Sequence, residues 1–244
     1  MTRGVPRRST RSWRRSNGTL VVDVDDATGL CLTGARFDAM HVVSPYMRDC
    51  VFEGVRVDHF AAVGHRGVPL EFVNCIFKDC DITANLVTNS SFDSVTFSGG
   101  WLRGWRCLGS SFINCAFSCQ VVSGFVDASP YAGSQRANVS RNDFSDADLC
   151  DFEFRGGVDL TQQRLPTAPP YRVVWDCRGL LDYLSTKVTI KSIDDPSRKS
   201  DLEVFATLLN ANLRGGQHHQ LLDSRELKPS VWASIEASGL VARP

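Results

Sequence analysis

The sequence has no long apolar run and no excess charge of either sign. Its apolar stretches fall far short of the roughly 20 residues that a membrane-spanning helix requires, so no membrane partner is expected. Lysine and arginine together number 27, and aspartate and glutamate also number 27. A chain with balanced charge has no overall field that would draw it to DNA or to a strongly charged protein. At 244 residues it has room for one elongated domain and a smaller one.

The residue patterns that usually carry catalysis are missing as well. None of the five histidines stands at a spacing that pairs it with a nucleophile or an acid. No glycine-rich loop of the phosphate-binding kind occurs. Asp146 and Asp148 belong to a repeated pattern instead of forming a separate acid–base pair. We therefore expect a protein that is not an enzyme, with no catalytic residues and no cofactor.

Nine cysteines are present, but their spacing is not that of a zinc site. Neither Cys75 with Cys80 nor Cys115 with Cys119 forms a CxxC pair. The basic start of the chain is followed by an apolar stretch that acids soon interrupt, which argues against an export signal. An odd number of thiols without such a signal fits a reducing compartment. We expect free thiols, no metal and a cytoplasmic protein.

What the sequence does have is a repeat of five residues. From Leu32 to Val122 an apolar residue returns at every fifth position, whereas an α-helix repeats near 3.6 residues and a β-strand near 2. Four sides of five residues, stacked layer upon layer, explain this period and a second one of twenty. Sorted by twenty, the positions form four columns: Leu32, Phe52, Phe72, Phe92 and Phe112; Phe37, Val57, Phe77, Phe97 and Phe117; Val42, Ala62, Ile82, Leu102 and Val122; and an irregular fourth, Met47, Gly67, Val87 and Cys107.

A small residue usually stands two positions before each central apolar residue, as with Cys50, Cys75, Cys80 and Cys115. A small and then a large side chain, both pointing inward, would fill the axis of a narrow stack without voids. This pattern, clear in "SFINCAF" at 111–117 and "NDFSDADLCDF" at 142–152, resembles the pentapeptide repeat family. The resemblance extends over residues 30–155 and implies an all-β solenoid, a right-handed quadrilateral β-helix of pentapeptide repeats.

The repeat divides the chain into four regions. Residues 58–71 are weakly patterned, although they keep the period of five, while residues 123–141 break it. Three prolines, Pro166, Pro169 and Pro170, then prevent a continued ladder or helix. We predict a basic flexible arm at 1–19, the β-helix at 20–160 with insertions near 58–71 and 123–141, a Pro-rich linker at 161–172, and a helical region at 173–244.

The C-terminal region is predicted to contain amphipathic helices. Ser200 and Glu203 stand in a capping-box relation, and Gly215 supplies a stop. Pro229 and Gly239 bracket a last helix. Because an amphipathic helix must bury one face, these helices either cap the β-helix or join two copies of the chain in a homodimer.

One side of the predicted β-helix departs from the repeat. Its small positions are occupied by Pro45, His65, Asn85 and Trp105, and the insertion at 123–141 begins beside it. Local failures of a sequence rule often mark functional places. Exposed Trp and Arg are favoured anchors of protein interfaces. The indoles of Trp101 and Trp105 could instead pack beneath the 123–141 loop or the C-terminal helices. We hypothesise a partner-binding surface made of His65, Trp101, Arg103, Trp105, Arg106, Tyr131 and Arg136.

The family resemblance implies a more specific candidate function. Bacterial members of the family protect type II topoisomerases such as DNA gyrase from drugs or toxins by imitating duplex DNA, which confers antibiotic resistance. Such mimicry needs a strongly negative face, but residues 30–155 contain 14 acidic and 10 basic residues. The small excess disfavours DNA mimicry. We expect a non-enzymatic scaffold that presents a β-helix flank and a loop to a protein partner, with topoisomerase protection as the sharpest candidate.

An alternative function comes from the start of the chain. The first fifteen residues contain no acid and six arginines, namely Arg3, Arg7, Arg8, Arg11, Arg14 and Arg15. Basic arms of this kind bind nucleic acid or acidic surfaces. The alternative is therefore a nucleic-acid-associated protein whose affinity falls steeply with salt and depends on this arm.

Overall fold

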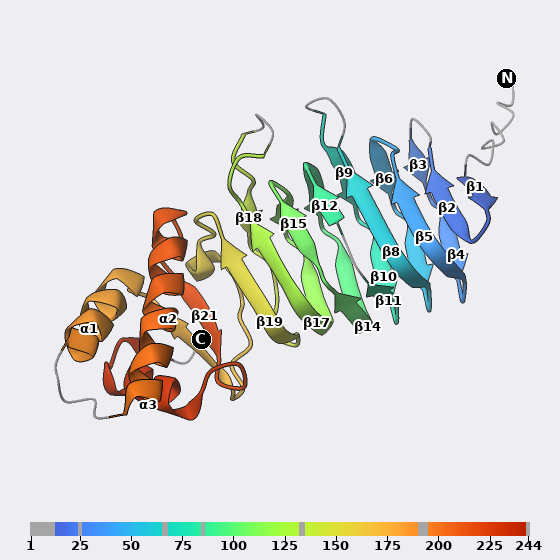
Figure 1. The fold of residues 1–244 in the computed structure, drawn as a ribbon. Helices are drawn as coiled ribbons and strands as arrows, with labels where there is room; N and C mark the ends of the chain where they lie inside the picture. Colours follow the sequence, from blue (N-terminus) through green and yellow to red (C-terminus); the bar gives the residue numbers. More distant parts are fainter. Residues whose placement is uncertain are drawn as a thin grey trace, which may run out of the picture.

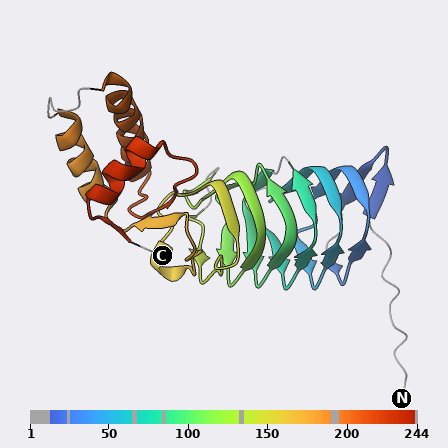
Figure 2. The ribbon, with the colours of Figure 1, turned by 90° about the horizontal axis from the view of Figure 1, so that it is seen from below.

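The fold of the chain, given by a computed structural model, is mostly β, with long parallel sheets and with helices in the C-terminal part (Figure 1). The structure describes residues 13–23, 26–64, 68–83, 86–131, 135–189 and 195–242. We call residues 13–165 the β stack and residues 171–242 the C-terminal unit. Figure 2 shows the layers of the β stack side by side, with the C-terminal unit at one end. Among the described residues, no helix combines the length and the apolar character that crossing a membrane requires.

The strands of the β stack form two sheets in which neighbours run parallel, apart from the antiparallel pair of β1 and β2. The larger sheet contains, in order, β1 (Trp13–Ser16), β2 (Thr19–Val22), β5 (Arg36–Val42), β8 (Arg56–Val63), β12 (Leu86–Thr88), β15 (Arg106–Leu108), β17 (Ala116–Asp127), β14 (Thr96–Arg103), β10 (Ile76–Lys78), β7 (Val51–Glu53) and β4 (Cys31–Thr33), with β11 (Asp81–Thr83) and β19 (Asp148–Arg155) off this path. The smaller sheet contains β18 (Val139–Ser140), β16 (Ser111–Ile113), β13 (Ser90–Asp93), β9 (Leu70–Val73), β6 (Tyr46–Arg48) and β3 (Ala27–Thr28).

Phenylalanine side chains stack along the core with the predicted period of twenty. Phe72 pairs in register with Phe92, and Phe92 with Phe112. Their ring centroids lie 4.6 Å and 4.7 Å apart, with interplanar angles of 3° and 1°. All three side chains are buried. The stacking of these residues is confirmed.

One layer contains five more residues than the columns assume. Phe52 pairs with Phe77, not with Phe72, and the two rings stack at 4.6 Å. Val57 likewise pairs with Ile82. The predicted columns are therefore wrong at this step and shift by one side. The five extra residues lie in the segment that joins β8 to β9, so the weakly patterned segment at 58–71 does contain an insertion. Because five residues are one full repeat, the insertion does not change which of the next residues point inward. The five-residue pattern therefore does not reveal the shift.

Corner residues in a left-handed conformation separate the short strands. Asn74, Asp79 and Asn114 have φ values of 53°, 53° and 55°, and each follows a central phenylalanine by two positions. Gly54 occupies the equivalent corner after Phe52, with φ of 63°. Asn, Asp and Gly tolerate this conformation better than other residues. Because these residues recur at the corners, a polar residue or a glycine stands two positions after the central phenylalanine of these repeats.

The cysteines of the small inward positions act as core-filling residues. The Cys75 thiol donates to the Met47 carbonyl at 3.4 Å, and the Cys115 thiol donates to the Phe92 carbonyl at 3.4 Å. Burial raises the pKa of the thiols of Cys115 and Cys119 to about 12. Protonated, buried thiols are poor nucleophiles, and these side chains therefore contribute packing.

Trp105 also lies inside the β stack. It is 2% exposed, stacks on Phe60 at 6.4 Å and meets the Phe97 ring edge-on at 5.4 Å. Its Nε1 has no hydrogen-bond partner among the described residues. An unpaired buried donor weakens the fold because it has lost its water partner.

The unpaired indole N–H leads to a stability prediction. The Trp105→Phe variant keeps an aromatic ring in this position and removes the buried donor. Because these two effects offset the small loss of volume, we expect the free energy of unfolding to stay within about 1 kcal/mol of wild type. Urea denaturation followed by circular dichroism measures the difference. A loss above about 3 kcal/mol would show that the N–H has a stabilising partner.

The boundaries of the β stack differ from the predicted regions. The described part of the predicted flexible arm is not an arm, since β1 and β2 form an antiparallel pair at the first layer. Residues 1–12 lie outside the described residues. The second insertion begins later than predicted, because β17 continues to Asp127 and pairs with β19 over its whole second half. The insertion thus falls between the end of β17 at Asp127 and the start of β18 at Val139.

The C-terminal unit combines helices with a small antiparallel sheet. Its strands β20 (Tyr171–Val174), β21 (Gln220–Asp223) and β22 (Val241–Ala242) lie in a region predicted to be linker and helix. These strands contribute side chains to two cores. Val173 and Leu221 belong to the core of the β stack, while Val174 and Leu222 belong to the core of the C-terminal unit. The sheet therefore attaches this unit to the end of the β stack.

The predicted helices are present, although one begins earlier. The structure contains η1 (Leu160–Gln162), α1 (Cys177–Thr189), α2 (Pro196–Arg214) and α3 (Pro229–Ala237). The capping box at Ser200 is wrong, because Asp195 caps α2 by accepting the Ser197 amide at 2.9 Å. Gly215 ends α2 as predicted, and Pro229 begins α3 as predicted. Helix α1 lies within the region predicted to be helical, although no separate helix was assigned to these residues.

Candidate protein-binding surface

One side of the β stack exposes several apolar side chains among polar ones such as His41 and Arg106. Its inward residues stack in register over six layers: Val42, Ala62, Val87, Cys107, Val126 and Phe154. We call it the Cys107 side. On its outer surface Val43, Val63 and Leu86 are 53%, 42% and 46% exposed. Exposed apolar residues that gather on one face mark interaction sites more often than scattered ones do.

Two projecting loops leave the β stack at the corner that borders the Cys107 side. Backbone hydrogen bonds link the successive corner positions, from Gly64 to Thr88 and from Gly109 to Asp127. The loop after β8 adds Val68, which is 54% exposed. The loop after β17 adds Tyr131, which is 40% exposed. Figure 1 shows both loops on the same edge of the stack. We call Val43, Val63, Val68, Leu86 and Tyr131 the apolar strip.

Of the predicted interface residues, Arg106 and Tyr131 adjoin this surface. Arg106 is exposed and pairs in register with Leu86 on one side and with Phe125 on the other. Arg136 is held in place, since its guanidinium donates two hydrogen bonds to the Gly156 carbonyl. His65 lies outside the described residues.

The other predicted residues lie elsewhere. Trp101 and Arg103 flank Leu102 on the neighbouring side, where the Arg103 guanidinium covers the Trp101 ring at 4.4 Å and forms an ion pair with Asp81. Trp101 is 37% exposed. Trp105 is a correction: because it is buried among Phe60 and Phe97, it cannot touch a partner. The irregular side was inferred from columns that the extra five residues displace.

A cleft of about 560 Å³ opens where the last layers of the Cys107 side meet the C-terminal unit. Its apolar lining comes mainly from the C-terminal unit and includes Phe205, Leu208, Leu221 and Leu227. Its charged lining consists of one arginine and five acids, namely Arg155, Asp127, Asp151, Glu153, Asp223 and Glu226. The cleft therefore favours a ligand that is basic and partly apolar.

Glu226 joins the two parts of the molecule inside this cleft. Its carboxylate accepts a hydrogen bond from the Asp151 backbone amide in β19. Burial of the carboxyl group and the nearby carboxylates of Asp223 and Asp151 raise the pKa of Glu226 to about 7, although the residue as a whole is partly exposed. Arg225, which pairs with Asp223 at 2.6 Å, opposes this shift.

The raised pKa of Glu226 predicts a pH dependence near neutrality. The folded chain binds this proton more tightly than the unfolded chain, whose Glu226 has the ordinary pKa of 4.5, so protonation of Glu226 stabilises the fold. This contribution to stability is complete below pH 4.5 and is lost as pH rises through about 7. The Glu226→Gln variant keeps the acceptor oxygen and does not titrate. Urea denaturation between about pH 4.5 and 7.5 is expected to show a decline of stability in wild type that is smaller in the variant. Parallel curves would contradict the assignment.

Sequence reasoning missed the apolar strip. Val43, Val63 and Leu86 occupy outward positions of the repeat, where polar residues are the norm. A search of the outward positions for apolar residues would have found them. Among the described residues, no three His, Cys, Asp or Glu side chains gather in a way that would hold a metal ion. Comparison of the chain with protein-family models, curated proteins and solved structures finds no match.

Proposed function

We propose that the β stack is a right-handed quadrilateral β-helix of pentapeptide repeats and that the chain is a non-enzymatic, cytoplasmic scaffold which binds a protein partner through the apolar strip. The parallel strands with a twenty-residue register support the proposed fold. The observation that carries the function is the exposure of Val43, Val63 and Leu86 on one side of the stack, in two rows that flank the inward residues Ala62 and Val87. A flat, rigid β surface loses little conformational entropy when a partner covers it.

A pair of matched variants tests the strip. Leu86→Asp places a charge in the strip, while Ile76→Asp places the same charge on a different side of the stack. Leu86 and Ile76 are similarly exposed, at 46% and 40%, and each begins a short strand. Both variants are expected to fold. We expect wild type and Ile76→Asp to capture the same proteins from host extract, and Leu86→Asp to lose them. Equal capture by all three would contradict the proposal.

A supercoiling assay tests the topoisomerase candidate directly. If gyrase is the partner, wild type is expected to alter gyrase activity or its inhibition by a quinolone, and Leu86→Asp is expected to lose that effect. Ile76→Asp is the control and should behave as wild type. No effect of wild type at about 10 µM protein would remove gyrase as the partner while leaving the strip to be tested by capture.

A further inference from the structure

The carboxylates of the cleft are only partly neutralised. Glu153 pairs with Arg155 at 2.7 Å, and Asp223 pairs with Arg225. Asp127, Asp151 and Glu226 form no ion pair with any described residue. They accept hydrogen bonds from the Ser129 amide, the Ser123 hydroxyl and the Asp151 amide, respectively. Asp127 and Asp151, and Glu226 when it is ionised, are thus able to pair with a cation.

An apolar helix face lies beside these carboxylates. Leu208 of α2 lines the cleft and is 59% exposed, and Val204, one turn earlier on the same face, is also 59% exposed. In addition, the Oε1 atom of Gln220, another lining residue, is buried and has no hydrogen-bond partner among the described residues. A segment that brings guanidinium donors together with a few apolar atoms would pair with the carboxylates and cover the exposed helix face.

The start of the chain has this composition. Residues 1–12 contain Arg3, Arg7, Arg8 and Arg11 together with Val5 and Pro6, and no acid occurs before Asp23. The rest of the chain after residue 15 has 27 acids against 21 basic residues. We propose that this arginine arm (residues 1–12) of one copy of the chain binds in the acidic cleft of a second copy.

Distance favours a second copy over the arm's own cleft. The strand β1, which begins at Trp13, lies at the end of the β stack opposite the C-terminal unit (Figures 1 and 2). Six strand-to-strand steps connect β2 to β19, which amounts to about 29 Å at roughly 4.8 Å per step. Arg8 stands five residues before Trp13, so its Cα atom lies at most about 18 Å away, and an extended side chain does not make up the difference. Arg8 and Arg11 therefore cannot enter their own cleft.

Binding of an arm to the next copy's cleft is a head-to-tail contact. The two contacting surfaces differ, so the contacts either close, as when two copies exchange arms, or leave a vacant cleft to which a further copy can bind. Contacts of this type therefore generate closed rings, the smallest being an arm-exchanged dimer, or open chains. The proposal therefore predicts association that grows with protein concentration and that weakens with salt, since the contact is between opposite charges.

Complementary variants of the full chain test this assembly by analytical ultracentrifugation. R7E/R8E reverses charge in the arm, and D127N/D151N/E226Q neutralises the cleft while keeping side-chain size. Wild type at about 50 µM in low salt is expected to sediment as species larger than a monomer. Each variant alone is expected to associate at least about tenfold more weakly. Mixed together, they should form dimers that do not grow, because one partner supplies the arm and the other the cleft.

A matched control and the opposing outcomes complete the test. D146N/D182N/E203Q removes the same charge from exposed acids outside the cleft and should assemble as wild type does. The arm variant changes only residues outside the described fold, and circular dichroism verifies that the cleft variant is folded. A monomeric wild type in low salt, unchanged association of either variant, or a mixture without dimers would each overturn the proposal. So would an arm that binds oligonucleotides while the chain stays monomeric.

Discussion

Replacing Phe92 with alanine is expected to lower the free energy of unfolding by about 3–5 kcal/mol. Phe92 is 0% exposed, and its ring is held between Phe72 at 4.6 Å and Phe112 at 4.7 Å. The strand ladders hold these three residues in register, so the layers cannot move together to fill the space. Because a folded domain is typically stable by only about 5–15 kcal/mol, this loss would bring the chain close to unfolding at moderate temperature.

Urea denaturation of Phe92→Ala and of the control Ile76→Ala measures this effect. Ile76 is also a strand residue, but it is 40% exposed and points outward. Its replacement should change stability by no more than about 1 kcal/mol. If both variants lose the same free energy, the phenylalanine column is not the main source of cohesion between layers. An intermediate loss for Phe92→Ala would show that the layers relax into the cavity.

Much of the β stack could be predicted because its contacts repeat. An inward side chain meets the residues one layer above and below, and those stand at a fixed distance along the chain. The stacking of Phe72, Phe92 and Phe112 follows from that distance. The layer between Phe52 and Phe77 could not be predicted, because an insertion of one full repeat leaves the following residues, as far as Phe117, with the same inward or outward direction.

The candidate site was predicted less well, for a related reason. Columns spaced by twenty placed Trp105 above His65 and Asn85, at a position that looked too narrow for an indole. In the structure the shift brings Trp105 next to Phe60, whose ring lies nearly parallel to the indole at 9°. Val63 and Leu86 occupy outward positions of the repeat, so the sequence did contain this signal, but the displaced columns directed the prediction to another side.

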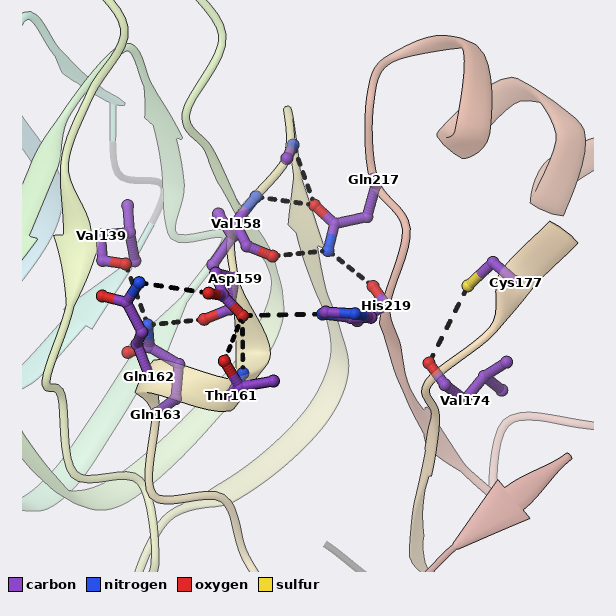
Figure 3. A network of polar contacts seen from close by, with 11 residues as sticks. Val139, Val158, Asp159, Thr161, Gln162, Gln163, Val174, Cys177, Gln217 and His219 are labelled. Carbon is purple, nitrogen blue, oxygen red and sulfur yellow. Dashed lines mark hydrogen bonds and ion pairs between the residues drawn. The ribbon is translucent and has the colours of Figure 1, made fainter.

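One contact that attaches the C-terminal unit is made by a buried amide, that of Gln217. This side chain is 1% exposed and enters the end of the β stack (Figure 3). Its Oε1 accepts the amides of Gly157 and Val158 at 3.0 Å and 2.9 Å. Its Nε2 donates to the carbonyls of Val158 and His219 at 3.0 Å and 2.6 Å. These contacts satisfy the backbone groups that the last layer would otherwise leave unpaired.

The Gln217→Leu variant is therefore expected to lose about 3–5 kcal/mol, because several backbone groups become buried without partners at about 1–3 kcal/mol each. Gln162→Leu is the matched control: this amide lies nearby but is exposed, so its loss should cost less than about 1 kcal/mol. Hydrogen exchange of the amides of Gly157 and Val158 provides a local measurement. Both amides should exchange much faster in Gln217→Leu, whereas their exchange rates should be unchanged in Gln162→Leu. Unaltered protection in Gln217→Leu would mean that the two cores joined by β20 and β21 hold the C-terminal unit without the amide.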